Sequence, residues 1–181
     1  MDKLTDYIGY YEDIVPDMLS KQLMWYSFDF KPSKFANHYG DMTKERSEER
    51  VRMDDVWISA ESSFHRKIDE CFDKVIEKYN YPHLNIERKT YFRFHRYSGT
   101  GYMSEHVDSI HHSHKQKYGF PHCTALLFLN DDYEGGEFLV ANKKFKTKKG
   151  SAIIFPSNFM YPHKVMEITK GVRWSIVTWL M

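Results

Sequence analysis

Cysteine is scarce in this chain of 181 residues, in which only Cys71 and Cys123 occur. Two cysteines so far apart cannot build a disulfide framework or the closely spaced thiolate set of a structural zinc module. The chain also has no apolar run that would serve as a secretory leader or span a bilayer. We therefore expect a cytoplasmic protein in a reducing compartment, with no membrane partner.

No sign of charge dominates either, because 26 Lys and Arg residues face 25 Asp and Glu residues, and the formal net charge is +1. A dedicated nucleic-acid binder needs a strongly basic face, so we expect no nucleic-acid partner. The exception is the basic run at residues 143–149, Lys-Lys-Phe-Lys-Thr-Lys-Lys. We expect this run to be a solvated hairpin turn rather than a phosphate-binding patch.

What the chain does have is a hydrophobic content of 41% and an aromatic content of 17%. This composition is sufficient for a folded core, and aromatic side chains favour strands. The length fits a single domain over residues 1–181. Residues 1–87 are expected to form a helical and irregular support region, and residues 88–181 a core of short strands.

The expected elements follow from periodicity and turn signals. Helices are predicted over residues 16–24 and from Ser62 or Ser63 to Tyr79, where an apolar stripe recurs at helical spacing. The polar stretch 28–52 is predicted to be a long surface loop. Strands are predicted at residues 89–97, 103–107, 124–129, 137–140, 151–155, 163–167 and 173–180. Short strands at this spacing predict a mainly β sandwich or jelly roll with helices packed on one sheet.

Histidine and aspartate two residues apart are the first candidate for chemistry. On a strand, His106 and Asp108 would point to the same side and converge on one point. With a distant histidine such as His163, they would form the 2-His-1-carboxylate arrangement that suits Fe(II). On its own the triplet fits a surface histidine and aspartate near a strand end better, so the downstream sequence carries the argument.

The last predicted strand carries an arginine on a face that is otherwise largely apolar. Arg173 shares this face with Ser175, Val177 and Trp179. A buried arginine is costly unless it pairs with an anion, and the guanidinium fork matches a carboxylate through two parallel hydrogen bonds. A bound dicarboxylic acid would supply the anion, and the alternative is a structural ion pair with a nearby acid.

These pieces form an ordered series. It runs Arg96-Tyr97-Ser98-Gly99-Thr100-Gly101-Tyr102, His106-x-Asp108, Leu127-Phe128-Leu129-Asn130, Tyr133-Glu134-Gly135-Gly136-Glu137-Phe138, Phe155-Pro156, His163-x-Val165 and Gly171-x-Arg173-x-Ser175-x-x-x-Trp179. In this series the half of the chain from about Tyr91 onward resembles the prolyl-4-hydroxylase-like Fe(II)/2-oxoglutarate dioxygenases. An arginine at position 173 is typical of their hypoxia-sensing, bacterial and phage types, whereas collagen-type enzymes place lysine there.

The resemblance implies a double-stranded β-helix, which is a jelly-roll barrel with iron at its mouth. It implies that His106, Asp108 and His163 bind Fe(II) and that Arg173 binds the distal carboxylate of 2-oxoglutarate. It also implies that Tyr97 hydrogen-bonds this co-substrate and that Trp179 lines the pocket. The implied reaction couples oxidative decarboxylation of 2-oxoglutarate by O2 to hydroxylation of a substrate, with ascorbate in a supporting role. Related halogenases lack the carboxylate ligand, so Asp108 favours hydroxylation.

The substrate that the resemblance implies is a peptidyl proline or another protein side chain. The first alternative is a free amino acid or another small molecule, and a non-catalytic metal-binding jelly roll is a further one. A nucleic-acid demethylase is disfavoured because Trp179 stands where that group carries a second arginine. We expect the substrate to face Arg93, His95, Tyr102 and His111.

The loop at residues 109–121 contains His111, His112 and His114, and His122 follows it. We expect this segment to be a polar lid at the mouth of the site rather than a second metal site. A monomer is the default expectation, since no segment is predicted to extend beyond the last strand.

Overall fold

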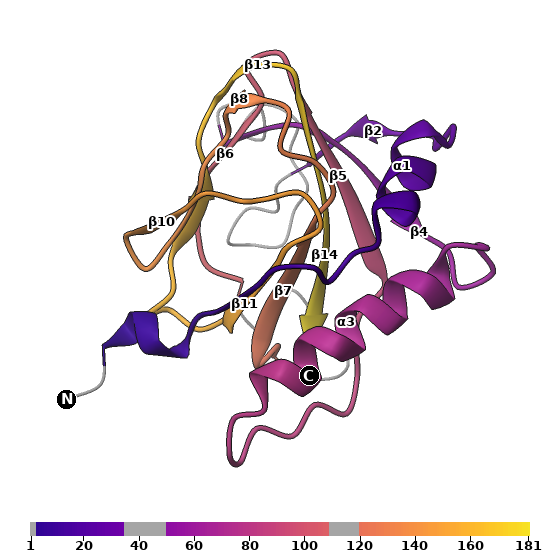
Figure 1. Cartoon of the computed structure of the whole chain (residues 1–181). Helices are drawn as coiled ribbons and strands as arrows, with labels where there is room; N and C mark the ends of the chain where they lie inside the picture. Colours follow the sequence, from indigo (N-terminus) through magenta and orange to yellow (C-terminus); the bar gives the residue numbers. More distant parts are fainter. Residues whose placement is uncertain (1–2, 35–49, 109–119) are drawn as a thin grey trace.

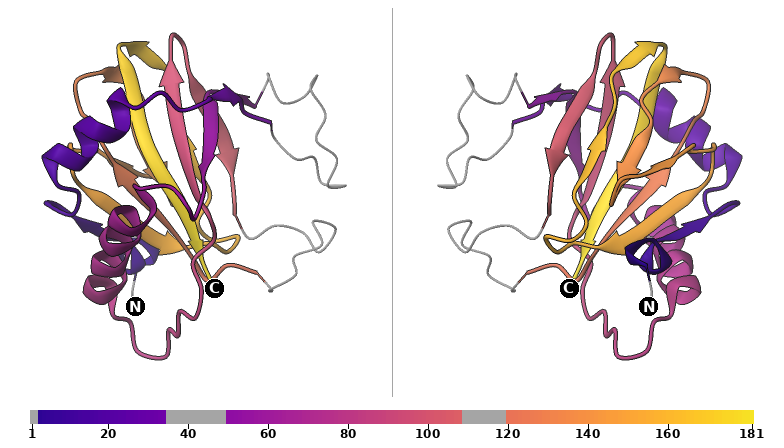
Figure 2. Two further views of the ribbon diagram at one scale, coloured as in Figure 1. Left: turned by 90° about the vertical axis from the view of Figure 1, so that its right-hand side faces the viewer. Right: turned by 90° about the vertical axis from the view of Figure 1, so that its left-hand side faces the viewer.

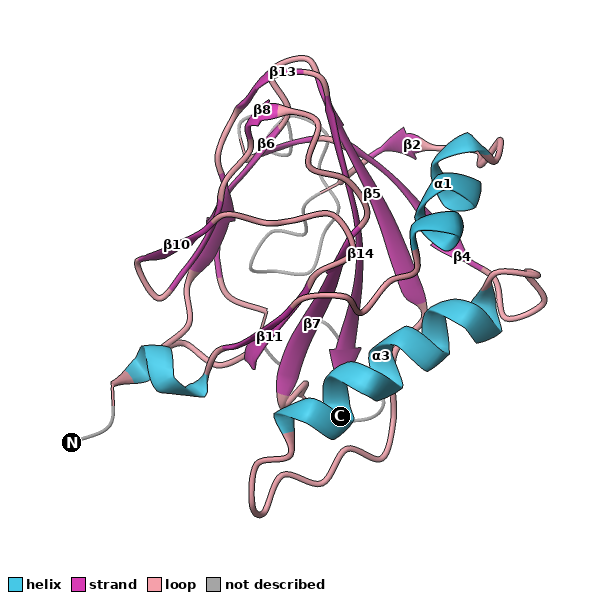
Figure 3. Cartoon of the chain, viewed as in Figure 1, coloured by secondary structure: helices cyan, strands magenta, loops and turns pink. Residues whose placement is uncertain are grey.

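The computed structural model describes residues 3–34, 50–108 and 120–181, and its helices are few (Figure 3). They are the 3-10 helix η1 (Leu4–Tyr7) and the α-helices α1 (Asp17–Trp25) and α3 (His65–Tyr79). Helix α3 buries the stripe that its periodicity predicted, including Phe72 and Val75, and ends at Asn80, where φ is 28°. No helix in these three ranges is long and apolar enough to cross a membrane.

Antiparallel strands make up the rest of the architecture. The large sheet has the order β1 (Gly9–Tyr11), β11 (Ala152–Pro156), β7 (Cys123–Phe128), β14 (Val172–Leu180), β5 (Phe92–Ser98), β4 (Asp54–Ile58) and β2 (Lys31–Pro32). The smaller sheet has the order β10 (Lys143–Phe145), β9 (Phe138–Val140), β12 (His163–Val165), β6 (Tyr102–His106) and β3 (Val51–Arg52). A short pair, β8 (Glu134–Gly135) and β13 (Ile168–Lys170), completes the fold.

The large sheet is buried on both faces, as the strand β7 shows. Its Ala125 and Leu127 join α1 and α3 in one hydrophobic core, whereas Leu126 and Phe128 join the smaller sheet in the other. Because side chains alternate along a strand, the two faces serve different cores. The helices therefore cover the outer face of the large sheet, and the two sheets enclose the inner core (Figures 1 and 2). This arrangement confirms the predicted mainly β jelly roll.

The N-terminal region differs from its prediction as a helical and irregular segment. Four strands, β1 to β4, lie within residues 1–87, and two of them fall inside the stretch that was predicted to be a surface loop. Phe28 and Phe30 of that stretch pack edge-on against Phe94 in the outer core. Residues 35–49 of this stretch lie outside the described residues. At its described ends the prediction is wrong, because polar composition does not reveal that Phe28 and Phe30 are anchored by tertiary contacts.

The basic run 143–149 also lies differently from its prediction. The hairpin between β9 and β10 turns at Ala141 and Asn142, both with positive φ, and the run begins on strand β10 rather than in the turn. Phe145 is buried in the inner core, and Lys144 pairs with Glu137. The lysines are thus spread along a strand and the loop after it.

Gly135 is the last residue of β8, and its backbone lies close to that of Glu167. Replacing it tests whether this position requires glycine. Its φ is 75°, and a Cβ atom there would overlap the carbonyl oxygen of Glu167. We expect Gly135→Ala to lower the free energy of unfolding by about 2 kcal/mol or more, because a left-handed non-glycine residue is strained and the backbone must shift. Chemical denaturation measures this effect.

Gly99→Ala is the matched control for this prediction. Gly99 also has a positive φ, of 33°, but nothing lies within 4 Å of an added Cβ atom. The control should therefore cost less than Gly135→Ala. Equal losses in the two variants would show that the overlap with Glu167 contributes nothing.

Candidate metal centre and co-substrate site

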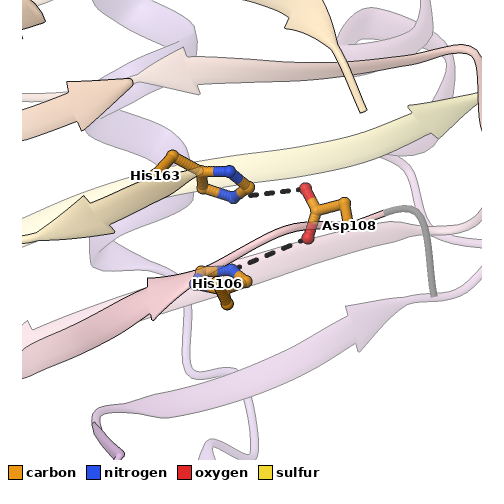
Figure 4. A group of neighbouring side chains, drawn as sticks. All are labelled: His106, Asp108 and His163. Carbon is orange, nitrogen blue, oxygen red and sulfur yellow. Dashed lines mark ion pairs between the residues drawn. The ribbon is translucent and has the colours of Figure 1, made fainter. Parts of the chain in front are cut away.

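Two strands of the smaller sheet bring three potential ligands together. His106 ends β6 and His163 begins β12, and the two residues are direct partners in the antiparallel ladder. Nε2 of His163 lies 3.3 Å from Oδ2 of Asp108, and Nε2 of His106 lies 3.6 Å from Oδ1. Figure 4 shows the three side chains pointing toward one another. The cluster that the sequence predicted is thus present in the structure.

Each side chain is oriented by a further hydrogen bond. Nδ1 of His106 lies 2.8 Å from the carbonyl oxygen of Ser104, and Nδ1 of His163 lies 3.2 Å from that of Tyr161. Because a carbonyl only accepts, both rings donate from Nδ1 and turn Nε2 toward Asp108. The Thr124 hydroxyl donates to Oδ2 of Asp108 at 2.7 Å. Such outer hydrogen bonds fix the tautomer and direction of metal-ligating groups.

The donor set fits a divalent iron. The ligand atoms of His106, Asp108 and His163 all lie within 4.8 Å of one another. Ligand atoms about 2.1 Å from one ion and at right angles lie about 3 Å apart, so only small adjustments separate this cluster from coordination. Two imidazoles and one carboxylate on one side of an ion make the facial triad of non-haem Fe(II) sites. Cys71 and Cys123 contribute nothing to it, since neither belongs to the cluster.

The protonation states of the three groups depend on one another. Burial would raise the pKa of Asp108, but the two histidines and the Thr124 hydroxyl hold it well below its usual range. Burial would lower the pKa of His163, but the Asp108 carboxylate raises it above its ordinary value. For His106, burial and then the neighbouring His163 lower the pKa to about 4. Without metal, His163 therefore keeps its proton to a higher pH than an ordinary histidine, whereas His106 loses its proton at a lower pH.

Metal binding must displace this proton. Because the pKa of His163 is raised, its protonated form persists to a higher pH than in an ordinary histidine. We expect the apparent affinity for Fe(II) or Mn(II) to fall as pH decreases between about pH 8 and about pH 6, approaching about tenfold per unit for one displaced proton. Calorimetric titrations in buffers of different ionisation enthalpy measure both the slope and the released proton. An affinity that stays constant over this range would contradict the assignment of the proton.

A buried arginine lies on the same inner face as the metal cluster. Arg173 on β14 is 0% exposed, and its Nη1 donates to the Ser175 hydroxyl at 3.3 Å. Its Nε and Nη2 have no hydrogen-bond partner among the described residues. The guanidinium carbon lies 5.0 Å from the ring centre of Tyr97 and 5.3 Å from that of Phe128. A buried cation with unpaired donors is stable only beside an anion, and a carboxylate matches the free edge of the fork.

The remaining predicted site residues have different surroundings. Tyr97 is buried, with its hydroxyl 3.9 Å from the Met103 sulfur and its ring against Arg173. Trp179 lies on β14 at the position next to Thr124 of β7. Tyr102 instead lies with its ring near the Arg52 guanidinium, at 5.7 Å.

The two candidate substrate residues on β5 behave differently from each other. Arg93 is held by the Asp55 carboxylate and by the Ser33 hydroxyl, which accepts from Nη2 at 2.9 Å. It therefore supports β4 rather than offering a free charge. His95 is buried and makes no hydrogen bond with any described residue. His111 and the other histidines of the 111–114 cluster lie outside the described residues.

Sequence reasoning missed the residues that act through tertiary pairing. Thr124 supports Asp108 and also lies 2.8 Å from the Ser157 hydroxyl. Asp55 anchors Arg93. Neither Thr124 nor Asp55 belongs to a recognisable sequence motif. Ser175 lies two places after Arg173 on the same strand face, and this spacing is the signal in the sequence that points to its contact with the arginine.

Comparison with known proteins agrees with this geometry. The profile of the 2OG-Fe(II) oxygenase superfamily matches residues 92–181. An Acanthamoeba polyphaga mimivirus protein, named provisionally as a prolyl 4-hydroxylase, is 31% identical over 140 residues, which are 68% of this chain and 55% of that protein. A PKHD-type hydroxylase of Alteromonas mediterranea is 35% identical over 95 residues, which are 48% of this chain and 41% of that protein. The chain thus spans about half the length of these relatives.

Among solved structures, a prolyl hydroxylase of Trichoplax adhaerens, in complex with a peptide of hypoxia inducible factor, superposes with a TM-score of 0.74. The match has 18% sequence identity and covers 98% of this chain and 84% of that one, so it establishes the shared fold. The triad, the buried arginine and the profile match agree with one another. Through residues 92–181, this chain belongs to the 2OG-Fe(II) oxygenase superfamily.

Proposed function

We propose that the chain is an Fe(II)- and 2-oxoglutarate-dependent hydroxylase that acts on a prolyl residue of a peptide or protein. The observation that carries the proposal is the pairing of the His106, Asp108 and His163 cluster with the unpaired donors of Arg173 inside one barrel. The first suits iron and the second suits the far carboxylate of the oxo acid.

When bound, iron, 2-oxoglutarate and O2 supply the oxidising chemistry that turns a substrate C–H bond into C–OH, with succinate and carbon dioxide as the other products. His106, Asp108 and His163 would hold the ion, and Fe(II) would supply open positions for co-substrate and oxygen. Arg173 orients the oxo acid by its far carboxylate. The buried side chains of Leu126, Phe128 and Val177 line the inner core and keep water from the reacting centre.

A prolyl substrate is supported by the relatives and by the aromatic surface at the metal end of the barrel. Trp57 is 52% exposed, and its ring centre lies 6.3 Å from that of Trp179. Trp179 is the ladder partner of Thr124, which supports Asp108, so the two indoles lie at the metal end. Extended proline-containing peptides dock on aromatic surfaces of this kind. The nearly balanced charge of the chain gives a polyanionic substrate no advantage.

The first test is spectroscopic. Anaerobic protein loaded with Fe(II) should develop a weak charge-transfer band near ~500 nm when 2-oxoglutarate is added, because the oxo acid chelates an open iron site. In air, succinate release should then rise with a proline-containing peptide and not with the same peptide in which alanine replaces proline. Mass spectrometry should place one added oxygen on the proline.

The outcomes separate the two halves of the proposal. Absence of the band in folded, metal-loaded protein would refute the oxygenase. A band accompanied by oxidation of free L-proline, but of no peptide, would replace the peptide substrate with the small-molecule alternative.

A further inference from the structure

The histidine in the middle of β5 has no evident structural purpose. His95 is only 5% exposed, yet neither Nδ1 nor Nε2 has a hydrogen-bond partner among the described residues. A buried imidazole that belongs to the core is normally satisfied through at least one nitrogen, and leaving both unsatisfied is destabilising. The ring therefore points to a partner that is not among the described residues.

The strand register places His95 beside the head of Arg173. Ser175 of β14 is the direct ladder partner of both His95 on β5 and Phe128 on β7. These three residues, His95, Ser175 and Phe128, form one row across the sheet, which we call the row of His95. Because Arg173 donates from Nη1 to the Ser175 hydroxyl, its guanidinium reaches this row. Both groups lie near the Tyr97 ring, whose centre is 6.0 Å from that of His95 and 5.0 Å from the guanidinium carbon. An anion paired with Arg173 would thus meet His95.

The same strand register shows on which side of the row of His95 the metal cluster lies. Thr124, which supports Asp108, pairs with Trp179, four residues along β14 from Ser175. Four residues of a strand span about 13 Å, so the row of His95 and the metal cluster lie at two levels of one barrel. The Arg173 guanidinium reaches Ser175, at the end of this span away from Thr124. A short dicarboxylate held at the metal by one end then extends its other end toward the row of His95.

The row of His95 offers hydrogen-bond donors besides the Arg173 guanidinium. Phe128 has no polar atom, whereas the Ser175 hydroxyl accepts from Arg173 and keeps its own O–H to donate. Burial, followed by the charges of Arg93 and Arg173, lowers the pKa of His95, so the imidazole is neutral and carries one N–H donor. A carboxylate has about four acceptor positions, and a guanidinium fork fills two of them.

We propose that His95 donates a hydrogen bond from its ring N–H to the far carboxylate of bound 2-oxoglutarate, beside Arg173, and so determines co-substrate affinity. This inference rests on the proposed function. It assigns the buried histidine to the co-substrate, whereas the sequence had suggested a place facing the substrate.

The test measures the dissociation constant of 2-oxoglutarate from the charge-transfer band of anaerobic Fe(II)-loaded protein. His95→Leu removes the donor and should weaken 2-oxoglutarate binding by about 10- to 100-fold, the effect of losing one hydrogen bond to a charged group. His95→Asn retains a donor and should recover part of the loss. His83→Asn, a change at an exposed histidine, is the control and should bind as wild type does. If His95→Leu does not fold, His95→Phe removes the donor while keeping a ring.

A second ligand separates a contact with the carboxylate from a general disturbance. The acid 2-oxopentanoate has the same chain length but lacks the far carboxylate, so its affinity should be the same in wild type and His95→Leu. Equal weakening of both acids would overturn the proposal, as would unchanged 2-oxoglutarate binding in every His95 variant. Failure of the proposed function is distinguishable, because wild-type protein would then show no 2-oxoglutarate band at all.

Discussion

Replacing Asp108 with alanine is expected to weaken Fe(II) binding by about 1,000-fold or more and to abolish turnover of 2-oxoglutarate. Loss of an outer hydrogen-bonding partner alone costs a metal site about 10- to 100-fold in affinity, and Asp108 is a direct ligand. It is also the anionic member of the cluster, since His106 and His163 can offer only neutral nitrogens. Competition with a metal chelator measures the affinity, and succinate release measures the turnover.

Asp29→Ala is the matched control, because the Asp29 side chain is 80% exposed and pairs only with Lys31 among the described residues. Thermal denaturation adds a readout that does not depend on activity. Wild-type protein and Asp29→Ala should be stabilised by Mn(II), whereas Asp108→Ala should not, because an ion stabilises a fold only to the extent that it binds it. A metal-dependent rise in melting temperature that persists in Asp108→Ala would place the metal elsewhere.

Most strands of the C-terminal half were predictable because local signals mark them, whereas the short strands β8, β10 and β13 were not predicted. Short runs of β-branched and aromatic residues, bounded by turn residues, identified β7 within one residue of its observed start and end. The apolar stripe of α3 was equally clear, since its buried side chains recur at helical spacing. In both elements the residues that the sequence marks as apolar are the ones that the cores require.

Strand β4 was not predictable, and the reason is physical. It begins with two aspartates, a residue type that disfavours strands. The strand is stable in the fold because Asp54 pairs with Arg96 and Asp55 with Arg93, across the ladder to β5. These cross-strand pairs join residues roughly forty positions apart in the sequence. No local sequence pattern predicts them.

In the site, too, features with a local sequence pattern could be predicted, and features that depend on strand pairing could not. The spacing of His106 and Asp108, and the arginine on an apolar strand face, are local patterns, so they could be predicted. The support that Thr124 gives to Asp108, and the place of His95 in the row of Arg173, depend on the pairing of β7, β14 and β5. Sequence reasoning could place His95 on a strand but could not tell whether its ring would be exposed, paired or buried without a partner.

Replacing Arg173 with methionine is expected to change ligand binding and fold stability in opposite directions. The substitution removes a charged, two-pronged partner of the far carboxylate, so 2-oxoglutarate affinity should fall by about 1,000-fold, as for the loss of one member of a buried charged pair. Arg173→Lys keeps the charge but loses the fork, and its affinity should lie between the two. Titration of the charge-transfer band measures these constants, with Arg96→Met as a control on the opposite face of β5.

In the absence of 2-oxoglutarate, the same Arg173→Met variant should be as stable as wild type or more stable, by about 1–3 kcal/mol in the free energy of unfolding. The reason is that Arg173 is fully buried and has no anionic partner among the described residues, whereas methionine fills a similar volume without a charge. A structural arginine would behave in the opposite way, since its removal would cost stability and leave 2-oxoglutarate binding nearly intact. The sign of the stability change, measured by denaturation of the metal-free protein, therefore decides whether this arginine serves the fold or the co-substrate.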